Sequence, residues 1–176
     1  NDLNSIRALV DEDPKKSKLA ITQLSNILRN SLILDKKKLI SFEDEIKTVK
    51  DYLELESVRY EERLIVKYNI ASESIDFNVP PMMIQTLVEN GIKHGVSKLT
   101  NGGTIAITTE VNDHTLKIEI RNSGQYKHKK SDDQMGFGLQ NTIKRLDLIY
   151  GDQASFLIQN ENNNTVLTQL VIPETI

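Results

Sequence analysis

Polar residues in the segment Leu87–Gly95 have types and spacing that could hold a magnesium nucleotide. Asn90, Lys93 and His94 lie three and four positions apart, so on a helix they share one face, opposite the apolar residues. Glu89 lies about 100° around the helix from Asn90. An amide oxygen can coordinate Mg²⁺, and a cationic side chain can face phosphate. A solvated helix face would show the same pattern, so the segment alone leaves both interpretations open.

Two later segments combine short polar side chains with glycine. Asn122 and Gly124 follow an alternating strand pattern, and the Asn122 side chain could hydrogen-bond the edge of a base. Gly136 and Gly138 precede a helix, where glycine backbone can approach a phosphate and the unpaired N–H groups favour an anion. A simple turn explains the first segment equally well, and a hinge explains the second. The Rossmann and Walker patterns are excluded, because neither a βαβ order nor the lysine motif is present.

Helices are predicted over the first sixty residues. Asp13 and Pro14 cap and start one helix, which carries apolar residues at helical spacing. Ser41 caps another, in which an acidic first turn favours the positive helix end. Four leucines and isoleucines of the earlier helix could form the seam of a dimeric bundle or pack within the chain: Leu24, Ile27, Leu28 and Leu32. The carboxylates Glu54, Glu56, Glu61 and Glu62 are predicted to form a solvated face.

From about residue 61 the pattern changes to strands and helices in mixed order. Strands are predicted at 64–70, 75–79, 104–110, 116–121, 155–160 and 165–172, helices at 80–94 and 138–150, and a loop at 122–135. The fold class is therefore α+β, with a helical region at 1–60 and a mixed domain at 61–176.

Composition limits the function classes. Hydrophobic residues make up 38% and charged residues 27%, which is typical of a soluble globular chain. The net charge of −3 provides no basic field for nucleic acid. There is no cysteine, so disulfide and thiol chemistry are excluded. No apolar run approaches the roughly 20 residues that span a bilayer, so we expect a cytoplasmic domain whose connection to a membrane lies upstream of Asn1.

Taken in order, these segments resemble the nucleotide site of the GHKL ATPase superfamily and, more narrowly, LytS-type sensor histidine kinases. Val79–Gly95 is similar to the asparagine motif of that family, and Gly136–Leu146 is similar to its glycine motif. Tyr52–Tyr60 resembles the linking-helix signature, and Asn1–Arg7 resembles the residues that follow the phosphorylated histidine. The resemblance covers nearly the whole chain.

The resemblance implies a Bergerat-type two-layer α/β sandwich with a mixed, mainly antiparallel sheet, preceded by helices of a dimerisation region. It implies ATP and Mg²⁺ as cofactors, Asn90 as the metal ligand and a lid at about 125–137. It also implies phosphoryl transfer to a histidine, a response regulator of the LytTR type as partner, and a homodimer. The implied catalytic residues are Glu89 and Asn90, and the implied nucleotide-binding residues are Asn90, Lys93, His94, Asn122, Gly124, Gly136, Gly138 and Leu139.

The chain departs from the family pattern at two positions of the base site. Asn122 stands where the superfamily usually has Asp, and Tyr126 stands where it has a second glycine. A neutral amide accepts the adenine N–H more weakly than a carboxylate does. The phospho-accepting histidine is expected a few residues before Asn1, because His94, His114 and His128 all lie in other contexts. A degenerate signalling scaffold and a GHKL serine kinase therefore remain as alternatives.

Overall fold

The computed structural model describes residues 7, 10–34, 38–126 and 136–174. Two long helices come first, α2 (Pro14–Leu34) and α3 (Phe42–Tyr60). The expected caps are present: the Lys16 N–H donates to the Asp13 carboxylate at 3.1 Å, and the Asp44 N–H donates to the Ser41 hydroxyl at 3.1 Å. The part of the predicted helical region that precedes Val10 lies largely outside the described residues.

The sheet has five strands in the order β2-β4-β5-β7-β6. Their bounds are β2 (Leu64–Asn69), β4 (Gly103–Asn112), β5 (Thr115–Ser123), β6 (Ser155–Asn162) and β7 (Thr165–Pro173). β2 runs parallel to β4, and the other pairs are antiparallel. The prediction of a mixed, mainly antiparallel sheet is confirmed.

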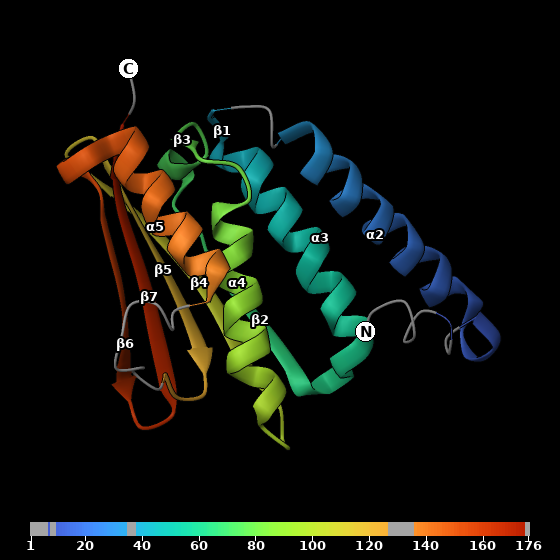
Figure 1. The fold of residues 1–176 in the computed structure, drawn as a ribbon. Helices are drawn as coiled ribbons and strands as arrows, with labels where there is room; N and C mark the ends of the chain where they lie inside the picture. The colour runs from blue at the N-terminus through green and yellow to red at the C-terminus, as the bar shows by residue number, and fades with distance from the viewer. Residues whose placement is uncertain (1–6, 8–9, 35–37, 127–135, 175–176) are drawn as a thin grey trace.

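Helices cover one face of this sheet (Figure 1). α4 (Met83–His94) and α5 (Phe137–Tyr150) lie over the sheet, α3 lies beside α4, and α2 packs on the outer side of α3. Short 3₁₀ turns at Glu61–Arg63, Ser72–Ser74, Val96–Lys98 and Gly151–Gln153 connect these elements. The α+β two-layer sandwich that the resemblance implied is confirmed.

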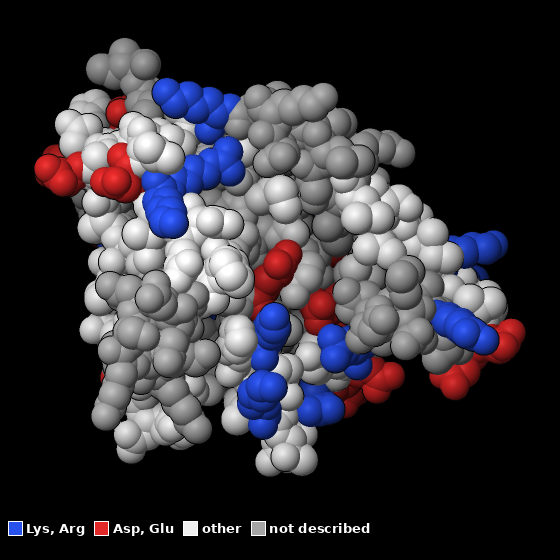
Figure 2. Space-filling model, in the orientation of Figure 1, with Lys and Arg blue, Asp and Glu red and all other residues white. Residues whose placement is uncertain are grey.

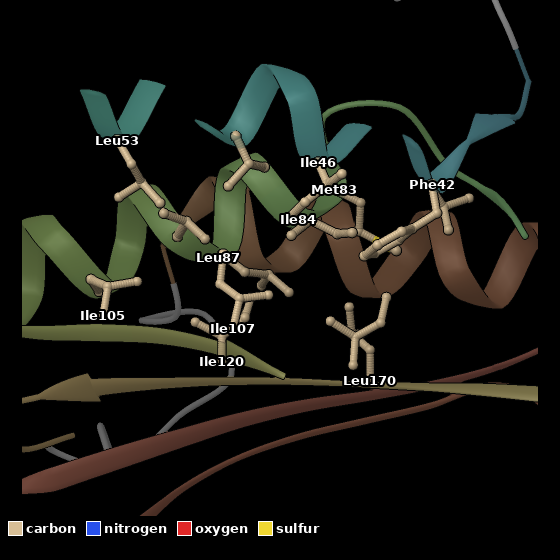
Figure 3. Packing of buried hydrophobic residues seen from close by; sticks show 14 of the residues in the cluster. Phe42, Ile46, Leu53, Met83, Ile84, Leu87, Ile105, Ile107, Ile120 and Leu170 are labelled. Carbon is tan, nitrogen blue, oxygen red and sulfur yellow. The ribbon is translucent and has the colours of Figure 1, made fainter. Parts of the chain in front are cut away.

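A single apolar core joins α3, α4 and α5 to the sheet. Figure 3 shows Ile84 and Leu87 of α4 lying between α3 and the sheet residues Ile107 and Ile120. Full burial of a side chain such as Leu87 contributes ~1.5–3 kcal/mol. Because α3 shares this core, it packs as part of the sandwich. The predicted division into a helical region at 1–60 and a mixed domain at 61–176 remains a prediction.

A smaller apolar contact joins α2 to α3. Ala20 and Leu55 are buried there, with Leu24 packed against them. Beside them, the Gln23 amide donates to the Glu54 carboxylate. Leu28 is 57% exposed. Of the described residues predicted to form a dimer seam, Leu24 therefore packs within the chain and Leu28 faces outward. The side chains of Ile27 and Leu32 lie outside the described residues.

Several sequence predictions are corrected by the structure. The strand expected at 75–79 is reduced to β3 (Asn78–Val79), which pairs with β1 (Ile40–Ser41). The helix expected from residue 80 begins at Met83. The loop expected from residue 122 begins later, because Asn122 and Ser123 still pair with β7. Glu56 is only 4% exposed, so the prediction that it belongs to a solvated face is wrong. Among the described residues, no helix is long and apolar enough to cross a membrane.

Candidate nucleotide site

Asn90 lies on the polar side of α4 with its amide held in one orientation. Its Nδ2 donates to the backbone oxygen of Thr86 at 2.8 Å, one turn earlier. Donation by the nitrogen leaves the Oδ1 atom as the acceptor that can face a ligand. Glu89, the neighbouring carboxylate, instead accepts a hydrogen bond from the Gln85 amide at 2.7 Å. Both Asn90 and Glu89 are half-buried, as residues at the rim of a site would be.

The first turn of α5 lies directly against this part of α4. A Cβ atom placed on Gly138 would lie 3.1 Å from the Thr86 Cγ2 and 3.8 Å from the Asn90 Nδ2. The structure therefore brings Asn90 and Gly138 together, although the chain separates them by the whole of β4 and β5. Glycine suits this approach, because a Cβ atom here would require the Thr86 methyl group to move by a few tenths of an ångström.

Asn122 forms the floor of the candidate site at the end of β5. It is 5% exposed, and its Nδ2 donates to the Ser123 backbone oxygen at 3.1 Å. Glycines of α4 lie over it: a Cβ on Gly91 would be 3.2 Å from the Asn122 Oδ1. Gly124 has a φ of +132°, and a Cβ there would be 2.8 Å from the Cα of Gly95. The backbone of α4 and the end of β5 are therefore in close contact.

The remaining predicted residues surround this centre in different ways. Gly136 is the N-cap of α5, and a Cβ there would meet no atom within 4 Å. Leu139 is 7% exposed and belongs to the core, so it packs α5 against the rest of the domain. Lys93 and His94 are exposed in the last turn of α4. Figure 2 shows Lys and Arg side chains gathered where the C-terminal end of α4 lies in Figure 1.

The start of the predicted lid is fastened to the β6–β7 hairpin, a contact that sequence reasoning missed. The Tyr126 N–H donates to the Asn160 Oδ1 at 2.7 Å, and the Asn160 Nδ2 donates back to the Tyr126 oxygen at 2.9 Å. The Gln125 amide donates to the Asn163 oxygen at 2.8 Å. The Asn-rich segment at 160–164 was the only signal, and asparagine there is equally typical of a turn. Most of the lid, residues 127–135, lies outside the described residues.

Glu45 is a second residue whose contacts sequence reasoning missed. The sequence placed it with the acidic first turn of α3, where it lies, but its carboxylate points to α4 and is fully buried. Burial raises the pKa of Glu45 from 4.5 to about 7, opposed by hydrogen bonds from the backbone N–H groups of Gln85, Met82 and Ile84 and by the charge of Arg145. A single sequence gives no sign of such a long-range partner.

His114 lies away from this centre. His114 is 89% exposed at the β4–β5 turn, where its Nδ1 lies 2.6 Å from the Glu174 carboxylate. His128 lies outside the described residues. Within the described part of the chain, no group of three or more His, Cys, Asp or Glu residues could hold a metal ion.

Comparison with known proteins shows which proteins the chain is similar to. The family described as "Histidine kinase" matches residues 1–64. Sensor protein LytS of Staphylococcus epidermidis is 30% identical over 97% of this chain and 31% of its own length. Sensor histidine kinase BtsS of Escherichia coli is 30% identical over 98% of this chain and 30% of its own length. The chain thus spans about a third of the length of these relatives.

Solved structures show the same fold. The catalytic domain of histidine kinase ThkA superposes with a TM-score of 0.60 and 18% identity, covering 78% of this chain and 96% of that domain. The fold is therefore that of the catalytic domain of histidine kinases. Along nearly its whole length the chain is related to the sensor proteins LytS and BtsS, and residues 1–64 match the histidine kinase family.

Proposed function

We propose that this chain binds Mg-ATP between α4, the end of β5 and the first turn of α5, and transfers the γ-phosphoryl group to a histidine of its parent protein. The observation that carries the proposal is the convergence of Asn90, Asn122 and Gly138 from three separated segments. The resemblance to Bergerat-type kinases implies that these three positions surround the nucleotide. Catalysis at such a site consists mainly of positioning and of neutralising phosphate charge.

The residues present fit a magnesium nucleotide. The fixed amide of Asn90 presents an oxygen, the kind of ligand that Mg²⁺ prefers, and Mg²⁺ usually takes few protein ligands besides phosphate and water. When bound, the metal would neutralise phosphate charge. The first N–H groups of α5, at Phe137, Gly138 and Leu139, precede the first intrahelical donor, Gln140, and can bind phosphate oxygens. Lys93 and His94 would lie toward the same phosphates, and Glu89 would assist from the helix rim.

Asn122 would recognise the base through its buried amide. The amide nitrogen is engaged by the Ser123 oxygen, so the Oδ1 atom would accept from the adenine amino group, with Gly124 leaving room for the ring. The partners we propose are a response regulator, a LytTR-type regulator in particular, and a second copy of the parent protein. ThkA has been solved in complex with the response regulator TrrA, and full-length ShkA with AMPPNP. We also propose that the chain is a cytoplasmic part of a membrane-tethered parent.

Calorimetric titration with Mg-ATP tests the nucleotide site. Asn90→Ala should weaken binding by about tenfold or more, because the metal ligand is lost. Asn112→Ala is the matched control: its amide also makes a local hydrogen bond, to Glu110 at 2.7 Å, but it lies on the far hairpin. Equal affinities for the two variants would remove Asn90 from the site. For the transfer step, the parent protein should take up acid-labile phosphate from ATP, and uptake of acid-stable phosphate would indicate a different acceptor.

A further inference from the structure

Helix α4 begins without a capping side chain of its own. Its N-cap residue, Met82, has a left-handed backbone with a φ of 61° and makes no side-chain cap hydrogen bond. The first N–H groups of a helix have no acceptor within the helix, and leaving them buried and unpaired is costly. Glu45 of α3 provides the acceptors. Its carboxylate accepts from the N–H of Met82 at 2.8 Å, Ile84 at 2.9 Å and Gln85 at 3.2 Å.

Helix α5 holds the same turn from another direction. The Arg145 Nη1 donates to the Pro81 backbone oxygen at 3.0 Å, and its charge acts favourably on the Glu45 carboxylate. Glu45 is 0% exposed, so its interactions with these groups are not screened by water. The turn at Pro81–Met82 is therefore the point where α3, α4 and α5 are joined by polar contacts.

A continuous series of hydrogen bonds leads from this junction to the nucleotide site. The Met82 N–H donates to Glu45, and the Met82 oxygen accepts from the Thr86 hydroxyl at 2.7 Å and the Thr86 N–H at 3.1 Å. The Thr86 oxygen in turn accepts from the Asn90 amide at 2.8 Å. The Thr86 methyl group also lies against Gly138. A displacement of Met82 therefore changes both the orientation of the Asn90 amide and the spacing between α4 and α5.

We propose that Glu45 is a positioning residue through which α3 controls the nucleotide site: its carboxylate fixes the start of α4 and, through Met82 and Thr86, the Asn90 amide. The inference rests on the proposed function of that site. Because α2 packs on α3 at Ala20 and Leu55, a change in the packing of α2 reaches Asn90 by this route. Coupling between two such sites is typically worth about 5–150-fold in affinity.

Glu45→Gln tests the proposal, and Glu43→Gln is the matched control. The control removes the same charge from the same helical turn, but Glu43 is exposed. Glu45→Gln should bind Mg-ADP about tenfold more weakly than the unsubstituted chain, and Glu43→Gln should bind equally well. Amide hydrogen exchange should accelerate at Ile84 and Gln85 and remain slow in β5. Equal nucleotide affinity in Glu45→Gln and Glu43→Gln would overturn the proposal.

A second measurement needs no substitution, so it holds even if Glu45→Gln fails to fold. Coupling is reciprocal, so a nucleotide that requires the ionised carboxylate must favour that form. Saturating Mg-ADP should lower the titration midpoint of the Glu45 carboxyl carbon, observed by NMR, although the negative charge of the nucleotide alone would raise it. An unchanged or raised midpoint would show that Glu45 has only a structural role. If titration of the unsubstituted chain with Mg-ADP detects no binding, the proposed function has failed, and the positioning role of Glu45 fails with it.

Discussion

Replacing Gly95 with alanine tests how closely α4 approaches the end of β5. A Cβ atom at this position would lie 2.6 Å from the Gly91 oxygen and closer still to the Asn122 amide nitrogen and the Ser123 oxygen. Two of these three atoms belong to the backbone, so they cannot rotate away as the end of a flexible side chain would. The helix must therefore move away from the strand, or Asn122 must leave its position.

The expected cost follows from this overlap. Overpacking a close contact costs ~1–3 kcal/mol, and two backbone neighbours place Gly95→Ala at the upper end of that range. For a chain of this size, ~3 kcal/mol corresponds to a decrease in Tm of about 6–12 °C. The same displacement would disturb the floor of the nucleotide site, so affinity for Mg-ATP should fall in parallel.

Thermal and denaturant unfolding measure this effect, and Gly136→Ala is the control. A Cβ at Gly136 would meet nothing within 4 Å, and its φ of −57° suits alanine. Restricting the unfolded chain stabilises the variant and the weaker N-cap destabilises it, so its stability should change by less than ~1 kcal/mol. A Gly95→Ala variant as stable as the unsubstituted chain would refute the close approach of α4 to β5, and with it the placement of Asn122 beneath Gly91 and Gly95.

Three further predictions concern Asn122, Glu45 and Ser41. Asn122→Asp should raise ATP affinity about tenfold and sharpen selectivity for ATP over GTP, because a charged acceptor binds the adenine amino group more strongly; competition titrations with both nucleotides check this. Glu45 holds a proton in the folded chain between pH 4.5 and about 7 that the unfolded chain releases, so its contribution to stability falls as pH rises through that window. That loss amounts to ~3 kcal/mol, so urea unfolding of Glu45→Gln should show the variant gaining this much relative to the unsubstituted chain from pH 4.5 to 8, and parallel pH curves would contradict it. Ser41→Ala should lower the free energy of unfolding by ~1 kcal/mol through loss of the cap on α3, measured by urea unfolding.

The parts of the fold that the sequence predicts are those with a local signal. Alternation of apolar residues located β5, and the caps at Asp13 and Ser41 located the starts of two helices. The short pairing of β1 with β3 was missed, because two residues are too few to show a period. The helix start was misjudged at residue 80 because Pro80 and Pro81 suit a first turn, whereas the polar contacts of Glu45 place that start at Met83.

The site residues that the sequence predicted are likewise those that belong to a local motif. Asn90 and Gly138 were recognised from motifs, and the structure supplies their contact through Thr86. Glu45 and Asn160 carry no motif, because their partners lie far along the chain and a carboxylate or an amide has the same sequence pattern when it is exposed. Long-range polar contacts of this kind depend on how the helices pack, which periodicity does not specify.

Chemical-shift mapping with Mg-ATP tests the central claim most directly. Backbone amide resonances of Gly91, Asn122, Gly124 and Gly138 should shift together with one saturation curve, because one nucleotide contacts all three segments. Resonances of the β4–β5 turn at His114, on the far end of the sheet, should remain unchanged. Saturable shifts confined to other residues, or no shifts at millimolar Mg-ATP, would contradict the assignment of a nucleotide site between α4, β5 and α5.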